Sequence, residues 1–290
     1  MADLIVPLFN MSCPTPTELD QNSTIHGRAE HLQRIVDEAR KRYLVRTPWD
    51  PEHFLVITNA DVSGNIRSSA GVIADEMILG LRLYKAGGVY YNFLLVVNPP
   101  ASGESTSDDV HGLRALALYY YNVYDHKGIP YVYELTPDDM KPLRDVLGLT
   151  RSRQLLEKRC FRNFFQAYHE PLTSDRFLKN AVALENILVN DGGFSNISYK
   201  FVDRGCYVLQ RVAPHSGGAA GHAGRLKEIY KARSGLVHSR KNDPDWSSTE
   251  SQEMLADSET YVRQLLVLTL QDPRFEKSEF IDEEKRKGYL

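Results

Sequence analysis

The sequence predicts an α+β protein in two parts, a mixed α/β region over residues 1–150 and an all-helical region over residues 151–290. Two observations predict this division. In the first half, runs rich in β-branched and aromatic residues, typical of strands, alternate with helical patterns. After about Thr150 the apolar residues recur only at the three- and four-residue spacing of amphipathic helices. The 290 residues, 42% hydrophobic and 25% charged, suit a soluble globular protein of one large or two ordinary domains.

Local patterns predict the elements of the mixed region. Residues 26–44 have helical spacing, and Thr24 stands where a helix cap is expected. The apolar run 89–97 is the best strand candidate, and 54–58 is a shorter one. The other expected elements are a helix over 73–84 closed by Gly87 and Gly88, a polar loop over 98–109, an element of ambiguous type over 113–121, a strand over 131–135 and a helix starting at Thr136.

Turn-forming residues divide the helical region. Pro171 ends a first helix over 156–168, and Thr173, Ser174 and Asp175 can cap a second over 177–188. The remaining expected elements are helices over 195–211, 225–241 and 247–271, a flexible glycine-rich connection over 214–224 and a charged, partly ordered tail from Asp272.

Charge and cysteine content exclude several classes of protein. The net charge of −3 gives no global basic field for nucleic acid. Cys13, Cys160 and Cys206 are widely spaced and form no CxxC pair, which argues against a disulfide framework or a cysteine zinc site and favours the cytoplasm. The first residues have no basic stretch before an apolar run that Pro7 breaks, so we expect no signal peptide. The longest apolar runs are too short to span a membrane.

We expect neither a metal nor a cofactor. The sequence contains no HExxH and no GxSxG, so zinc proteases and α/β-hydrolases have no support. Residues 64–71 lack the lysine and the spacing of a phosphate-binding loop. Asp108, Asp109 and His111 resemble a metal cluster only superficially.

The most informative stretch is 233–238, which places an arginine five residues before a histidine, late in the helix expected over 225–241. Arg233 falls within about 20° of the centre of that helix's apolar stripe, and His238 lies toward its edge. An arginine there must be paired, or must face a site that uses its charge, because an unpaired buried charge is costly. On a helical wheel, the stripe within about 60° of its first member consists of Leu226, Ile229, Tyr230 and Val237.

A basic cluster surrounds this motif. Six lysines and arginines, at positions 225, 227, 231, 233, 240 and 241, face one acidic residue, Glu228. Such a cluster is usually a solvated helix face. Its coincidence with Arg233 and His238 favours an anionic ligand.

An R-x4-H motif late in the penultimate helix of a helical bundle resembles the HEPN superfamily, and in more detail its ApeA-like group. The likeness covers roughly residues 155–270 and is carried by the segments 175–185, 203–204 and 229–238. It implies an all-α HEPN-like bundle, a homodimer that joins two such motifs in one cleft, and a metal-independent endoribonuclease. It also suggests a role in antiviral defence or toxin-like growth arrest, with residues 1–150 sensing a regulatory ligand or protein.

The resemblance implies catalytic roles for Arg233 and His238. RNA supplies its own nucleophile, the 2′-OH, so cleavage to a 2′,3′-cyclic phosphate and a 5′-hydroxyl needs proton transfer and charge stabilisation. His238 can move the proton, and Arg233 can hold the phosphate oxygens. Glu185, Arg204 and Ser234 are the supporting candidates. Ser234 departs from the Asn, Asp or His that many active members carry after the arginine.

Two further considerations bear on this site. By ideal helix geometry Arg233 and His238 are about 140° apart around the helix and about 7.5 Å apart along it, so a single helix presents them imperfectly. A second chain would supply a second arginine and a second histidine. This would separate the acid and base roles.

Plainer interpretations stay open. Arg233 can be a structural partner of Glu185, His238 can interact with the helix dipole, and Arg204 can belong to an ion pair. His215 and His222 are expected in a solvated loop. The main alternative function is a non-catalytic helical dimer that binds RNA, a nucleotide or another protein. A second alternative places the active site in residues 1–150.

Overall fold

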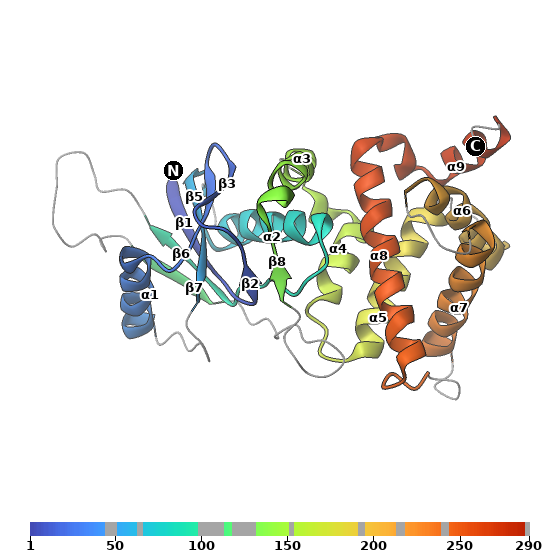
Figure 1. Ribbon diagram of the computed structural model, residues 1–290, viewed down its shortest axis with the longest axis horizontal. Coiled ribbons are helices and arrows are strands. Elements are labelled where there is room, and N and C mark those ends of the chain that lie inside the picture. The colour runs from blue at the N-terminus through green and yellow to red at the C-terminus, as the bar shows by residue number, and fades with distance from the viewer. Residues whose placement is uncertain are drawn as a thin grey trace. The chain divides into compact units, whose positions relative to one another are not determined.

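The computed structural model describes residues 1–43, 51–62, 66–97, 113–117, 132–150, 154–190, 195–212, 218–238 and 244–287. Among these residues the chain forms two compact units (Figure 1). The first, called here the sheet unit, extends to Gly148, and the second, called the helical unit, begins at Leu149. The division lies two residues before the expected boundary at 150. The protein is α+β, as the sequence predicts.

An antiparallel sheet with the strand order β3-β4-β5-β1-β6-β7 forms the centre of the sheet unit. The first strand lies inside this sheet, between β5 and β6, and is buried along nearly all its length. A separate parallel pair joins β2 and β8. The strands are β1 (Ala2–Leu8), β2 (Met11–Ser12), β3 (Thr17–Asp20), β4 (Ser23–His26), β5 (His53–Ala60), β6 (Phe93–Val97), β7 (Arg114–Ala117) and β8 (Tyr133–Glu134).

Helix α1 (Glu30–Tyr43) packs against the sheet through its apolar side. Leu32, Val36 and Ala39 on this helix form one buried cluster with side chains of β1, β5 and β6. Apolar burial of this kind is the main favourable contribution to folding. The unit also contains α2 (Ile66–Tyr84), a 3-10 turn (Pro137–Asp139) and α3 (Met140–Thr150).

Several expectations for the sheet unit need correction. Thr24 does not cap a helix but lies in β4, where it pairs with Val56 of β5. Helix α2 begins seven residues before the expected start, and the ambiguous segment contains the strand β7. The expected polar loop over 98–109 lies outside the described residues, as do Asp108, Asp109 and His111.

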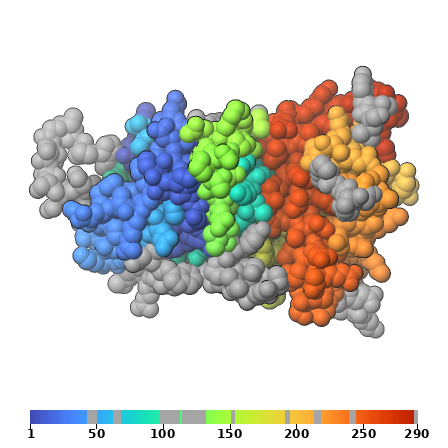
Figure 2. All heavy atoms as spheres, viewed as in Figure 1, coloured from blue at the N-terminus to red at the C-terminus, as the bar shows by residue number. Residues whose placement is uncertain are grey.

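All described elements of the helical unit are helices. Helix α5 packs against α4 and α8, and α6 packs against α7. The space-filling view shows the atoms of α8 as a continuous column along one face of the unit (Figure 2). The elements are α4 (Arg159–Ala167), α5 (Thr173–Leu188), α6 (Ile197–Val212), α7 (Gly218–His238), α8 (Thr249–Gln271) and α9 (Ser278–Arg286), with 3-10 turns at Leu155–Glu157 and Pro273–Glu276.

The expected flexible connection over 214–224 is wrong for the residues described. Helix α7 already begins at Gly218, and His222 is buried within it. The Nδ1 atom of His222 lies 3.0 Å from the hydroxyl oxygen of Tyr261 on α8, which gives this glycine- and alanine-rich stretch a tertiary contact that favours a helix. His215 lies outside the described residues.

The C-terminal tail contains a 3-10 turn and α9, and α9 is anchored to α6. Arg204 is only 2% exposed and donates from Nη2 and Nε to the two carboxylate oxygens of Asp282, at 2.6 and 3.0 Å. Its Nη1 donates to the Leu188 carbonyl at 2.8 Å. Lys285 on α9 pairs with Asp203 on α6. These contacts attach the charged tail to the helical unit.

The starts of two helices also differ from expectation. Lys158 has an extended backbone, so a 3-10 turn precedes α4 in place of one continuous helix from 156. Helix α5 begins at Thr173 after Leu172, which makes no side-chain capping hydrogen bond. The expected caps Thr173, Ser174 and Asp175 therefore lie within the first turn of α5, where the carboxylate of Asp175 is favourable to the helix dipole.

Candidate functional site

The R-x4-H motif occupies the last two turns of α7, which remains helical through Ser234 and Gly235. The inward side of this helix consists of Leu226, Ile229 and Ala232, all buried. The helical wheel placed Val237 in the apolar stripe, but this residue is 49% exposed and is not part of the buried side. Within the described part of the chain, α7 therefore ends in the exposed residues Val237 and His238, whereas its preceding turns are packed against other helices.

Arg233 is paired with Glu185 on α5. The Nη2 atom of Arg233 lies 2.8 Å from Oε2 of Glu185, and the two side chains are 20% and 24% exposed. The contact is an ion pair by distance but lacks hydrogen-bond geometry, and the buried Nε of Arg233 has no hydrogen-bond partner among the described residues. The structural pairing expected as an alternative is thus present. It compensates the charge of Arg233 and directs its guanidinium toward α5.

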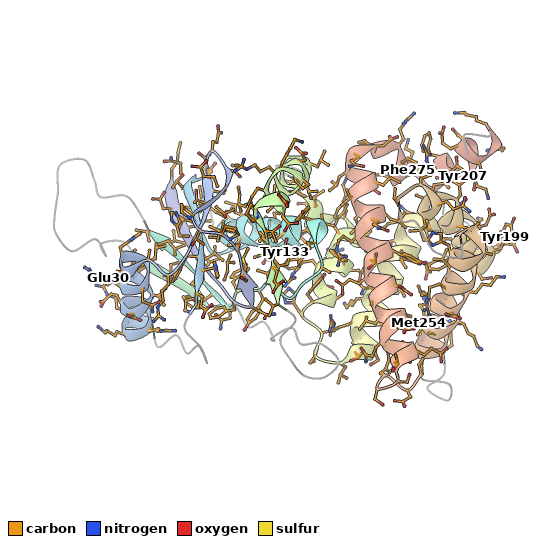
Figure 3. All side chains as sticks on the ribbon, in the orientation of Figure 1. Glu30, Tyr133, Tyr199, Tyr207, Met254 and Phe275 are labelled. Atoms are coloured by element: carbon orange, nitrogen blue, oxygen red, sulfur yellow. The ribbon has the colours of Figure 1, made fainter. Side chains whose placement is uncertain are left out.

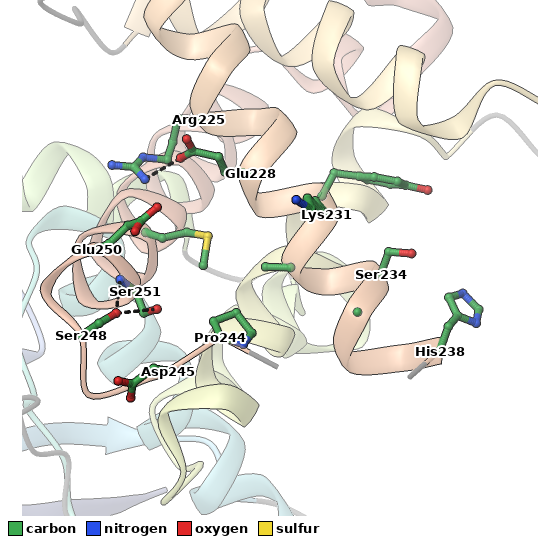
Figure 4. Close-up of a pocket in the computed structure, with 14 residues that line it drawn as sticks. Arg225, Glu228, Lys231, Ser234, His238, Pro244, Asp245, Ser248, Glu250 and Ser251 are labelled. Carbon is green, nitrogen blue, oxygen red and sulfur yellow. Dashed lines mark hydrogen bonds and ion pairs between the residues drawn. The ribbon is translucent and has the colours of Figure 1, made fainter. Parts of the chain in front are cut away.

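His238 is exposed at the end of α7, at the edge of an open groove of about 1010 Å³ (Figure 4). Ser234 and Gly235 line the same wall of the groove. Arg233 does not line it. The opposite wall is formed by the segment before α8 and by the first turns of α8, with Pro244, Asp245, Ser248, Glu250, Ser251 and Met254. The structure thus brings His238 and Ser234 to one groove and turns Arg233 away from it.

The start of α8 is well defined at the groove. Ser248 is the N-cap of this helix, and its Oγ accepts a hydrogen bond from the backbone N–H of Ser251 at 3.3 Å. Asp245 accepts two hydrogen bonds from Ser247, which lower the pKa of its carboxyl group. Asp245 therefore contributes a negative charge near neutral pH.

The groove is not strongly cationic. Three carboxylates, those of Glu228, Asp245 and Glu250, and two permanent cations, Arg225 and Lys231, are among its lining groups. Arg225 is moreover paired, at 2.7 Å, with both Glu228 and Asp257. In the basic cluster predicted from the sequence, Arg225 and Arg233 are paired with acidic side chains, and positions 240 and 241 lie outside the described residues. One copy of the groove therefore offers little net attraction to phosphate.

Arg204 lies apart from the groove. Its ion pair with Asp282 and its hydrogen bond to Leu188 link α6 to α9 and α5. The interpretation of Arg204 as an ion-pair partner is confirmed, and a direct contact with a ligand in the groove is not supported.

Sequence reasoning missed one wall of the groove, residues 244–251. The Ser248 cap is a readable signal for the start of α8, but nothing local indicates that this segment faces α7. It also missed an apolar pocket between α6 and α7, which involves the exposed ring of Tyr199. Such pockets depend on how two helices pack, which periodicity alone does not give.

The structure offers little for redox or metal chemistry in the residues it describes. Cys13, Cys160 and Cys206 are free, and burial raises the pKa of the first two thiols to about 11, which disfavours the reactive thiolate. The described part of the chain contains no group of three His, Cys, Asp or Glu side chains arranged to hold a metal. None of its helices is long and apolar enough to cross a membrane.

Comparisons with protein-family models, with curated proteins and with solved structures give no match to this chain.

Proposed function

We propose that the helical unit is a HEPN-like bundle and a cytoplasmic, metal-independent endoribonuclease that acts as a homodimer. The observation that carries this proposal is the placement of His238 and Ser234 on one wall of an open groove, at the end of a helix that also holds Arg233 against Glu185. The proposed products are a 2′,3′-cyclic phosphate and a 5′-hydroxyl.

His238 has the exposure that proton transfer to a substrate requires. An imidazole can take the proton of the 2′-OH or give one to the leaving 5′-oxygen near neutral pH. Arg233 remains cationic and can stabilise charge on the phosphate oxygens. Glu185 is proposed as the positioning residue that fixes Arg233, and Ser234 as a local hydrogen-bonding group on the groove wall.

A second copy of the chain is required in this proposal for two reasons. Within one copy, Arg233 does not line the groove that His238 borders. In addition, the groove of one copy is lined by three carboxylates and by two cationic side chains, those of Arg225 and Lys231. This balance disfavours a polyanion. Two α7 ends brought together would place two histidines and two arginines around one phosphate, so the acid and base roles could be divided between chains.

The test is cleavage of RNA in EDTA by the wild-type protein, Arg233→Ala and His238→Ala. We expect both variants to lose at least about 100-fold in rate, the usual contribution of a general acid or base. Arg162→Ala and His31→Ala, which replace exposed residues of the same types elsewhere, are the matched controls and should cleave normally. Wild-type cleavage that Arg233→Ala and His238→Ala leave intact contradicts the site and favours one in the sheet unit.

Mixed dimers test the composite site directly. Arg233→Ala and His238→Ala chains are co-expressed with different tags, and the mixed dimer is purified by both tags. This dimer keeps one arginine and one histidine, on different chains. Recovered activity supports a site shared between chains. An inactive mixed dimer contradicts it when a dimer of one wild-type chain and one Arg233→Ala/His238→Ala chain is active, because one chain then carries the whole site.

A second candidate function is a non-catalytic dimer that binds RNA, a nucleotide or a protein. The Arg233–Glu185 ion pair favours it, because that pair gives the arginine a structural role without any substrate. Folded wild-type protein that binds RNA but never cuts it would support this alternative.

For the sheet unit we propose a sensor or restraining role, in antiviral defence or toxin-like growth arrest. What supports it is the division of the chain into two compact units, with the motif confined to the second. The unit would take a regulatory ligand or protein. Its effect would appear as a change in cleavage rate that leaves the products the same.

A further inference from the structure

A second hollow of the helical unit lies between α6 and α7. It has a volume of about 490 Å³, within the range of pockets that hold small organic molecules. From α6 it is lined at helical spacing by Tyr199, Val202 and Cys206, and from α7 by Ala223, Lys227 and Tyr230, with Ser198, Asp203 and Lys231 completing the set. The exposed sides of two packed helices thus form its walls.

Close packing of the two helices shapes this pocket. A Cβ atom at Gly205 would lie 2.7 Å from Cδ1 of Leu226, so α6 and α7 approach closely because residue 205 is glycine. Gly205 and Leu226 directly precede Cys206 and Lys227 in the sequence, and the latter two line the pocket. The hollow is consequently part of the helix pairing and does not depend on a loop.

The lining of the pocket is mainly apolar and aromatic. Tyr199 is 68% exposed at the outer edge of the unit (Figure 3), so its ring is accessible to an occupant of the pocket. Tyr230 is half-buried and packs against Phe201, with ring centroids 5.4 Å apart. Two tyrosine rings on facing helices favour a flat, aromatic occupant.

Charge around the pocket favours an anion. Lys227 and Lys231 are exposed, and neither has an acidic partner among the residues that the structure describes. The one carboxylate of the lining, Asp203, is compensated by Lys285 of α9. The net field at the pocket is therefore positive, unlike that of the groove.

We propose that the α6–α7 pocket is a binding site for an aromatic carboxylate or sulfonate, with the rings against Tyr199 and Tyr230 and the anionic group at Lys227 and Lys231. The apolar lining disfavours a nucleotide, because a ribose and several phosphates would find few hydrogen-bonding partners there. This pocket shares Tyr230 and Lys231 with the groove, and its occupancy is tested without RNA.

The test uses a pair of matched fluorescent probes, 8-anilinonaphthalene-1-sulfonate and the uncharged N-phenyl-1-naphthylamine, titrated against the full-length protein. We expect saturable binding of the sulfonate and weaker binding of the neutral probe. Ala223→Phe should abolish the saturable phase by filling the pocket, whereas Ala256→Phe, at an exposed position of α8, should not. Lys227→Gln should weaken sulfonate binding about threefold and leave the neutral probe unaffected, with Lys277→Gln as the control.

Cys206 gives a local readout of occupancy, because its thiol lines the pocket and is only partly buried. The sulfonate should protect Cys206 from alkylation by iodoacetamide, as measured by mass spectrometry, with Cys13 as the internal reference. Equal binding of the two probes, or sulfonate binding that Ala223→Phe does not change, overturns the proposal. Protection of Cys206 that rises with protein concentration alone also overturns it, and assigns this face to a second copy of the chain.

Discussion

The two ends of α7 differ in their burial and in their contacts with neighbouring helices. In the first half, His222 contacts Tyr261, Leu226 is fully buried and Arg225 is held by acidic residues of α7 and α8. In the last turns, Val237 and His238 are exposed, and Arg233 is paired with Glu185 of α5. One helix thus combines an anchored half with a half that presents side chains. The motif therefore lies where the burial of α7 decreases toward its C-terminal end.

The largest effect should come from a matched pair of truncations along α7. Leu226→Ala removes a side chain with no exposed surface and should lower the free energy of unfolding by about 3 kcal/mol. Val237→Ala, at an exposed position, should change it by about 0.5 kcal/mol or less. Urea denaturation measures both values. Similar losses for the two variants would mean that the end of α7 is covered in solution, by a second copy or by another part of the chain.

A smaller effect is expected at the ion pair that links the end of α7 to α5. Glu185→Ala leaves Arg233 partly buried without its partner and should destabilise the protein by about 1–2 kcal/mol. The double variant Glu185→Ala/Arg233→Met removes the unpaired charge and should recover part of that loss. Thermal unfolding of the single and double variants checks this. If Arg233→Met alone is as stable as the wild type, the ion pair contributes little to stability.

The smallest effect concerns the acid stability of the tail. The hydrogen bonds from Arg204 hold the pKa of the Asp282 carboxyl below its usual range. A lowered pKa in the folded state means that the contribution is present above the ordinary aspartate pKa and is lost as pH falls through the folded value. Asp282→Asn should therefore be less stable than the wild type near pH 7, and the difference should shrink below about pH 4. Chemical denaturation at several pH values measures it, and a constant difference would show that the charge of Asp282 is unimportant.

The helices of the second half were predictable because their apolar residues recur at helical spacing over ten or more positions, as in α5 and α8. The strands β1 to β4 were not predicted. β1 and β4 pair with β5, and β1 also pairs with β6; both partners begin 27 or more residues after those strands end. β2 pairs with the distant β8, and β3 pairs with β4. The start of α7 and the whole of α9 were missed for a related reason. Both are held by contacts of distant residues, His222 with Tyr261 and Arg204 with Asp282.

Only part of the candidate site could likewise be predicted from the sequence. The Arg233–Glu185 pair could be anticipated because each residue falls on the apolar side of its own helix, where a charge needs a partner. The groove and the α6–α7 pocket could not be anticipated. Their walls come from separate helices, and no local pattern shows that 244–251 faces the end of α7 or that Tyr199 lies near Lys227.

Tyr230 and Lys231 border both the groove and the α6–α7 pocket. An occupant of either hollow therefore fixes side chains that the other hollow also uses. Thermodynamic linkage makes such an effect reciprocal: the factor by which a pocket ligand changes affinity in the groove equals the factor by which a groove ligand changes affinity in the pocket. If both proposed sites bind ligands, this turn of α7 couples the two binding equilibria without the movement of a domain.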